Sequence, residues 1–264
     1  MGRRIEMEKV IFFGNGALAD YALAVIERDC QVIFHARRKE DLEEVCRLKR
    51  ENPEAHGVLA SFGVMIPTRV LDLFEPDGIL NIHPSLLPLY RGASPIESAI
   101  LAGDADFSVS VMKLVKAMDA GPIYYQTTLS GLPLCKDEIY KTLAETGAEW
   151  IVKNLSDLPK PVLQDDAKAT FCGKMDKSMS LLTPEKDSAE TTLRKIVAYQ
   201  GYPKPKYTFY GVNCIVLDAH ALKLGEKAVL ELPCADGQIL AIERLQPEGR
   251  KPMEAKAFLN GYKK

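Results

Sequence analysis

An asparagine, a histidine and a carboxylate lie on two stretches near the middle of the sequence. Asn81 and His83 occur in Ile79-Leu-Asn-Ile-His-Pro84, and Asp119 occurs in Ala117-Met-Asp-Ala-Gly-Pro122. Neighbouring glycine and proline allow the backbone to turn sharply and approach a ligand. An amide can donate to a developing oxyanion, an imidazole titrates near neutral pH, and a carboxylate can orient that imidazole. Together the three predict a site for acyl transfer to an amine without a covalent enzyme intermediate.

Two other chemistries fit these residues less well. Nucleophilic hydrolysis needs a nucleophile, and Ser85 lies nearby, but Ser85-Leu-Leu-Pro lacks the flanking glycines of a nucleophile elbow. A metal site needs several close ligands, and the histidines are too far apart in sequence to suggest one, so we expect no metal. Each of the three residues taken singly also has a structural reading, such as a turn residue or a buried histidine. Their combination is what favours catalysis.

A glycine-rich turn follows the first apolar run. Lys9–Phe13 is apolar, and Gly14-Asn-Gly-Ala-Leu-Ala19 matches the dinucleotide pattern G-x-G-x-x-A, with Arg37 and Arg38 available for a 2′-phosphate. A tight strand-to-helix turn gives the same pattern without a ligand. A single motif of this kind is weak evidence, so an NADP-dependent oxidoreductase is a minor alternative and we interpret the turn as scaffold.

Alternating strands and helices would position these residues. Apolar runs predict strands at 9–13, 30–34, from 57 onward, at 78–82, 106–115 and 123–129. Helical spacing predicts helices after residue 19 and at 39–50, 68–74, 95–103 and 137–155. This order predicts an α/β fold with a parallel sheet, in which ligands bind beyond the carboxyl ends of the strands. Asn81 lies near such an end, and the strand at 106–115 would bring Asp119 next to it.

The pattern changes after residue 157. Residues 158–184 contain Pro, Lys and polar residues without sustained periodicity and are expected to form a linker. After a helix at 189–199, short apolar runs between 202 and 242 are separated by Gly, Pro and Asn, which predicts a small antiparallel barrel. We expect a first domain over 1–157 and a second over 185–264.

The composition is that of an ordinary globular protein. The 264 residues are 47% hydrophobic and 27% charged, with a formal net charge of −2, so no whole-molecule field points to nucleic acid. Residues 174–264 carry 15 basic and 11 acidic side chains, a net charge of +4, which leaves −6 before them. This excess supports an anionic partner only weakly. Scattered cysteines and the lack of a long apolar N-terminal run lead us to expect reduced thiols in a cytoplasmic protein.

Longer motifs around the three residues resemble those of a known family. Asn81-Ile-His83-Pro-Ser-Leu-Leu-Pro88, Arg91-Gly-Ala-Ser-Pro95 and Met118-Asp-Ala-Gly121 are together similar to the signature of folate-dependent formyltransferases. The segment from 169 to 177 and the tail from 245 to 261 resemble those of methionyl-tRNA formyltransferases. The resemblance covers nearly the whole chain.

This resemblance implies a Rossmann-like domain that binds 10-formyltetrahydrofolate and an OB-like barrel domain that helps to hold tRNA. It implies formyl transfer to the amino group of methionyl initiator tRNA, with catalytic roles for Asn81, His83 and Asp119. The implied folate contacts are Ser61, Phe62, Gly63, Val64, Met65, Ile66, Ser85, Leu86, Leu87 and Pro88. The expected tRNA contacts are Arg37, Arg38, Lys39, Arg91, Lys174, Lys177, Lys204, Lys206, Arg250 and Lys251. We expect a monomer.

The chain departs from the family after the second strand. Methionyl-tRNA formyltransferases usually carry a long basic loop there that enters the acceptor stem, followed by one more helix and strand. Here Arg37-Arg-Lys39 and one helix precede Gly57. The alternative enzyme is a nucleotide-sugar N-formyltransferase, although some of these place an arginine where Ala93 stands. A non-catalytic RNA-binding protein is a third alternative, but it has no use for the three central residues.

Overall fold

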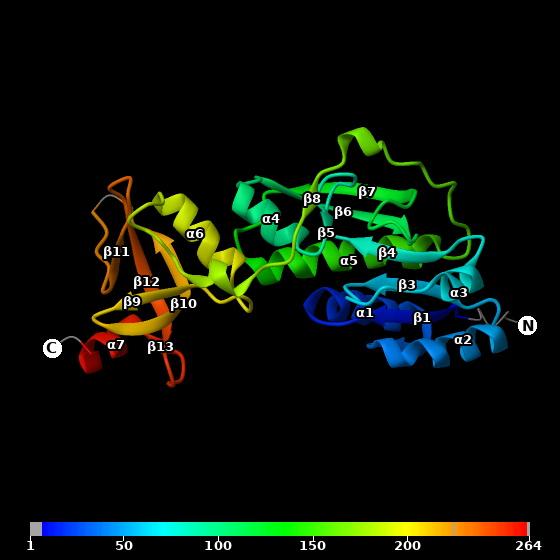
Figure 1. The fold of residues 1–264 in the computed structure, drawn as a ribbon, viewed down its shortest axis with the longest axis horizontal. Helices are drawn as coiled ribbons and strands as arrows, with labels where there is room; N and C mark the ends of the chain where they lie inside the picture. Colours follow the sequence, from blue (N-terminus) through cyan, green and yellow to red (C-terminus); the bar gives the residue numbers. More distant parts are fainter. Residues whose placement is uncertain (1–6, 224, 263–264) are drawn as a thin grey trace, which may run out of the picture. The chain divides into compact units, whose positions relative to one another are not determined.

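The chain folds into two units in the computed structural model, which describes residues 7–223 and 225–262 (Figure 1). One unit comprises the described residues up to Ile96 together with Ala105–Gly173. The other comprises Glu97–Asp104 and the described residues from Lys174 onward. The expected domain ranges also include residues 1–6, 224, 263 and 264, which lie outside the described residues.

Strands and helices alternate along the first unit. Its strands are β1 (Lys9–Gly14), β2 (Gln31–Ala36), β3 (His56–Ala60), β4 (Ile79–His83), β5 (Arg91–Gly92), β6 (Asp106–Lys113), β7 (Ile123–Ser130) and β8 (Phe171–Cys172). Its helical segments are α1 (Ala17–Asp29), η1 (Lys39–Asp41), α2 (Leu42–Glu51), α3 (Thr68–Leu71), η2 (Asp72–Phe74), α5 (Lys136–Asn154) and η3 (Asp166–Lys168). Helix α4 (Pro95–Ala102) begins in this unit and continues in the other.

The main sheet has the strand order β2-β1-β3-β4-β6-β7 (Figure 1). The pairs from β2 to β4 are parallel, as the alternation of strands and helices predicted. Strand β6 is antiparallel to β4, and β7 is antiparallel to β6, so the expected parallel sheet is mixed. The link between β6 and β7 spans residues 114–122 and contains no crossover helix, and such a link reverses the chain direction.

Strand β4 positions two of the central side chains. All five of its residues are buried, and side chains along a strand alternate between its two faces. Ile82 faces α5, because a Cβ on Gly147 of that helix would lie 2.8 Å from the Ile82 side chain. Asn81 and His83 therefore point to the opposite face, where Ile79 joins a core that includes Phe13.

The second unit is an antiparallel sheet with helices. It contains α6 (Ala189–Ala198), β9 (Lys206–Phe209), β10 (Val212–Ala221), β11 (Glu231–Pro233), β12 (Ile239–Pro247), β13 (Met253–Glu254), α7 (Ala255–Tyr262) and the short η4 (Lys177–Ser180). The strand order is β11-β12-β10-β9, and β13 also pairs with β12. The sheet curls into half of a barrel around a core that contains Val216, Leu245 and Phe258, in agreement with the expected OB-like domain.

Residues 158–173, which we call the strap, belong by their contacts to the first unit. Val162 forms an isolated bridge with Ile123 at the start of β7, and β8 pairs in parallel with β5. These are pairings of one or two residues, too short to leave a periodic pattern in the sequence. No helix in residues 7–223 or 225–262 is long and apolar enough to span a membrane.

Candidate active site

His83 and Asp119 lie side by side in the first unit. His83 Nδ1 is 3.8 Å from Asp119 Oδ1, and the two side chains are 6% and 15% exposed. His83 Nε2 lies 3.0 Å from the carbonyl oxygen of Tyr90. A carbonyl oxygen can only accept, so in neutral His83 the proton is on Nε2, and Nδ1 keeps its lone pair. Nδ1 is therefore the ring atom that can take up a proton, and it does so beside a carboxylate.

The loop between β6 and β7 fixes the position of Asp119. Asp119 Oδ2 accepts a hydrogen bond from the backbone N–H of Gly92 at 2.8 Å. Asp119 has a φ of +48°, a left-handed conformation that is strained for a residue with a side chain. Gly121 approaches the backbone so closely that a Cβ would lie 1.8 Å from the Lys113 carbonyl oxygen. The Asp-Ala-Gly sequence thus forms a tight loop that directs the carboxylate toward His83.

Asn81 lies two residues before His83 on the same face of β4. Asn81 is 5% exposed, and its side-chain amide forms no hydrogen bond with any other described residue. No fully buried side-chain nitrogen or oxygen atom of the described residues lacks a hydrogen-bond partner, so the Asn81 amide keeps some contact with solvent. Since the amide nitrogen is a donor, the Asn81 side chain is available to an acceptor atom of a ligand.

The loop at 61–66 is anchored through alternate side chains. Phe62 and Ile66 are buried in the core of the first unit, whereas Ser61, Gly63 and Met65 are exposed. The Ser61 carbonyl accepts a hydrogen bond from the backbone N–H of Asn15 at 3.1 Å. The Gly14–Ala19 turn therefore contacts this loop through the Asn15 N–H.

Side chains of β6 and β7 hold the segment at 85–88 in place. Ser110 Oγ is fully buried, accepts from the Leu87 N–H at 3.1 Å and donates to the Ser85 carbonyl at 2.6 Å. Gln126 Nε2 donates to the Leu87 carbonyl at 2.7 Å. Leu87 is itself buried and Ser85 Oγ already donates to the Leu89 carbonyl. Leu86 and Pro88 are left with the more accessible side chains.

A short, fixed loop follows β2. Asp41 accepts backbone N–H bonds from Arg37 at 2.7 Å and from Arg38 at 3.1 Å. The Arg37 bond is the main reason why the pKa of the Asp41 carboxyl is lowered, and the Arg38 guanidinium adds to this effect. Arg37, Arg38 and Lys39 are exposed.

Arg91 differs from the expectation of a surface residue that contacts tRNA. It is 4% exposed. Its Nε and Nη2 donate to Gln164 Oε1 at 3.0 and 2.7 Å, and Nη2 also pairs with Asp166 Oδ1 at 2.7 Å. The cation is thus committed to partners on the strap, which the sequence pattern did not predict as part of this unit.

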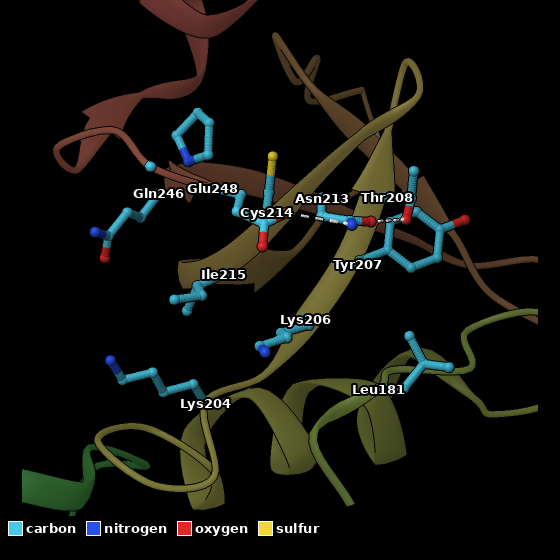
Figure 2. Close-up of a pocket in the computed structure, with 12 residues that line it drawn as sticks. Leu181, Lys204, Lys206, Tyr207, Thr208, Asn213, Cys214, Ile215, Gln246 and Glu248 are labelled. Carbon is cyan, nitrogen blue, oxygen red and sulfur yellow. Dashed lines mark hydrogen bonds between the residues drawn. The ribbon is translucent and has the colours of Figure 1, made fainter. Parts of the chain in front are cut away.

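The remaining predicted cations lie in the second unit. Lys204 and Lys206 line a pocket of about 440 Å³, together with Ile215 and Gln246 (Figure 2). All the other cations expected there are exposed, namely Lys174, Lys177, Arg250 and Lys251. The exposed cations of this unit therefore come from three places. Lys174 and Lys177 lie near its first residues, Lys204 and Lys206 lie just before and at the start of β9, and Arg250 and Lys251 follow β12.

Two known protein families match this chain, one in its N-terminal part and one in its C-terminal part. Residues 15–155 match the family described as formyl transferase, and residues 174–263 match the C-terminal domain of formyl transferases. The chain belongs to the formyl transferase family. Methionyl-tRNA formyltransferase from Dehalococcoides mccartyi is 35% identical over 225 residues, which cover 78% of this chain and 70% of that protein.

Solved structures show the same formyl transferase fold. HypX from Aquifex aeolicus in complex with tetrahydrofolic acid aligns with a TM-score of 0.77 at 18% identity, over 98% of this chain and 48% of that one. The methionyl-tRNA formyltransferase from Clostridium thermocellum aligns with a TM-score of 0.66 at 18% identity, over 94% of this chain and 99% of that one. This formyl transferase therefore spans about half the length of the HypX chain.

Sequence reasoning missed several groups of this formyl transferase site. The Tyr90 carbonyl, the Gly92 N–H and the side chains of Ser110, Gln126 and Gln164 all support the central residues or the segments beside them. Only Ser110 had a signal, because it alternates with valines in β6 and marks a polar position in an apolar strand. Backbone groups and single residues of an aperiodic segment leave no such signal.

Proposed function

We propose that this formyl transferase passes the formyl group of 10-formyltetrahydrofolate to the amino group of methionyl initiator tRNA, by direct attack of the amine. The observation that carries the proposal is the pair formed by His83 Nδ1 and Asp119, next to an Asn81 amide that has no partner among the described residues. The names of the relatives support the tRNA acceptor, and a neighbour bound to tetrahydrofolic acid supports the folate. We propose a cytoplasmic monomer with the expected domain boundaries at 157 and 185.

Each central residue has a proposed role that follows from its contacts. The Asn81 amide donates to the formyl oxygen as negative charge develops on it. His83 Nδ1 takes up a proton from the attacking amine and returns it to N10 of the folate as the bond between N10 and the formyl carbon breaks, so that tetrahydrofolate leaves. Asp119 stabilises the resulting imidazolium through its charge and keeps the ring oriented. The Tyr90 carbonyl contributes by fixing the tautomer in which Nδ1 is free.

The residues at 61–66 fit a flat folate ring system. When bound, 10-formyltetrahydrofolate supplies the carbon that the amine attacks. Backbone groups of an exposed, glycine-containing loop suit a heterocycle with many donors and acceptors, and Ser61, Gly63 and Met65 are the exposed members. Phe62 and Ile66 hold the loop in place through the core. The segment at 85–88 offers Leu86 and Pro88 as apolar neighbours.

Replacing Gly63 by valine should raise the KM for the formyl donor. Gly63 has a φ of +69°, and a Cβ there would project into open space, so the added side chain obstructs a ligand rather than the protein. We expect an increase on the order of tenfold, or about 1.4 kcal/mol, measured by initial rates at varied donor concentration. Gly131→Val is the matched control, since Gly131 has a φ of +75° and equally open surroundings. An equal KM for both variants would place the donor elsewhere.

Recognition of tRNA is proposed to depend on phosphate contacts from exposed cations of both units. Arg91 is excluded from this set by its burial. The proposed contacts are Arg37, Arg38, Lys39, Lys174, Lys177, Lys204, Lys206, Arg250 and Lys251. Phosphate contacts position a nucleic acid without reading its sequence. We therefore expect looser discrimination between initiator and other tRNAs than in relatives with a long basic loop after β2.

Lys174→Ala and Lys177→Ala should each raise the KM for methionyl-tRNA and flatten its salt dependence. A lysine that neutralises a phosphate releases counterions on binding, so its loss reduces the slope of log K against log salt by about 1. The KM for the formyl donor should stay the same. Lys256→Ala on α7 removes the same charge from an exposed position and serves as the control. A salt slope unchanged from that of the wild type would contradict these two contacts.

One assay tests the proposed function as a whole. Protein, 10-formyltetrahydrofolate and methionyl-tRNA are incubated together, and formylmethionine is measured after hydrolysis of the ester. The same assay with a nucleotide-linked amino sugar in place of methionyl-tRNA measures the rate of formylation of the alternative acceptor. Formylmethionine in the first reaction supports the proposal, and a far faster reaction with the sugar would replace it.

A further inference from the structure

Gln164 of the strap connects the two halves of the active site through its side-chain amide. Its Nε2 donates to the carbonyl oxygens of Asp119 and Gly121 at 2.8 and 2.7 Å. Its Oε1 accepts from Arg91 Nε at 3.0 Å and from Arg91 Nη2 at 2.7 Å. Both N–H donors and both lone-pair positions of the amide are thereby used, so the orientation of this side chain is strongly determined.

Arg91, which donates to Gln164, lies between two residues that contact His83 and Asp119. Tyr90 accepts from His83 Nε2 through its carbonyl, and Gly92 donates to the Asp119 carboxylate through its N–H. Arg91 is buried between them. The Arg91–Gln164 contact therefore ties the segment that orients His83 to the loop that carries Asp119.

The strap is attached to the first unit on both sides of Gln164. Before it, Val162 and Ile123 exchange two backbone hydrogen bonds, of 2.7 and 2.8 Å. After it, the Thr170 carbonyl accepts from the Arg91 N–H at 2.9 Å, and Thr170 Oγ1 accepts from the Tyr90 N–H at 2.8 Å. Leu163, next to Gln164, is 82% exposed, so apolar burial does not explain why the strap lies here. The polar contacts of Gln164 hold the strap together with these hydrogen bonds of Val162 and Thr170.

The Asp119 loop needs such support because its backbone is strained. Asp119 has a φ of +48°, and strained conformations persist only where the surroundings hold them. The N–H of Gly92 holds the carboxylate, while Gln164 holds the main chain on either side of Ala120. Without the Gln164 donors, two carbonyl oxygens lose their partners and the loop can relax away from His83.

We infer that Gln164 is a positioning residue for formyl transfer, which holds the Asp119–Gly121 backbone so that the Asp119 carboxylate stays beside His83 Nδ1. The inference rests on the proposed function, which gives Asp119 its part in the reaction. Gln164 itself touches no reacting atom. It acts through the loop, and Arg91 orients it.

Gln164→Glu tests this inference most directly, because it keeps the size of the side chain and the acceptors for Arg91 but removes both N–H donors. We expect kcat to fall by about 10- to 100-fold, since a displacement near 1 Å of a catalytic group can cost about 10². The KM for the formyl donor and the melting temperature should change little. Gln164→Met, which removes all four hydrogen bonds at similar length, should lower kcat at least as much. Gln238→Glu makes the same chemical change at an exposed position and should leave kcat unchanged.

A double-mutant cycle separates positioning from a general effect on folding. In an Asp119→Asn background, Gln164→Glu should cost much less than in the wild type, because residues that act through one another are not additive. An unchanged kcat in both Gln164 variants, an equal cost in both backgrounds, or a loss of kcat that parallels the loss of melting temperature would each overturn the inference.

Hydrolysis of the formyl donor in the absence of acceptor is measured in parallel with transfer to methionyl-tRNA. A wild type that only hydrolyses contradicts the proposed acceptor, while the hydrolysis rates still test Gln164.

Discussion

His83→Ala and Asp119→Ala should each lower turnover by about 10²- to 10⁴-fold, the usual size of a general acid–base contribution. The double variant should lose far less than the product of the two. This follows from their geometry, because Nδ1 of His83 faces Asp119 Oδ1 at 3.8 Å and the carboxylate acts by stabilising the protonated ring. Residues that work as a unit show such non-additivity. The measurement is kcat at saturating donor and acceptor for the four members of the cycle.

The chain offers a matched control for this cycle. His220 Nε2 lies 3.2 Å from Glu226 Oε1 in the second unit, and the two side chains are 45% and 40% exposed. His220→Ala and Glu226→Ala remove the same types of group and should leave turnover unchanged. Losses at His83 and Asp119 that multiply as independent effects do would show that the two residues do not act together.

Asn81→Ala should lower turnover by about 10²- to 10³-fold, as the loss of one oxyanion donor does in other enzymes. The side chain is buried and its amide has no partner among the described residues, so its removal leaves no protein group unpaired. The expected loss is therefore in kcat, with little effect on the free energy of unfolding.

Asn81→Asp provides the second measurement for this residue. It keeps the shape of the side chain but removes the N–H donors and adds a negative charge where the formyl oxygen would develop one. We expect it to be at least as slow as Asn81→Ala, with kcat and the melting temperature measured on both. Turnover equal to that of the wild type in either variant would assign Asn81 to structure.

Much of the fold followed from local patterns. Strand β1 was predicted from a short apolar run and helix α1 from apolar residues at helical spacing, and both elements are present. The strands β6 and β7 were also predicted, but their direction was not. The strands from β2 to β4 run parallel, with α1, α2 and α3 in their connections, whereas β6 runs antiparallel to β4 although α4 lies in the connection between them. The alternation of strands and helices therefore did not determine the direction of β6.

The sequence alone identified the family and the candidate side chains of the site, because side-chain type and the glycines and prolines that shape tight loops are properties of short segments. Asn81, His83 and Asp119 were found in this way, and His83 and Asp119 are indeed adjacent. Tertiary structure decided the rest. Gln164 and Arg91 are 73 positions apart, and nothing near either residue indicates that they meet. Arg91 was expected to contact tRNA, but it is buried beside the candidate site. The Tyr90 carbonyl accepts from His83 Nε2, which leaves Nδ1 as the nitrogen that can accept a proton. Burial and hydrogen-bond partners come from segments far apart in the chain, so they exist only once the chain has folded.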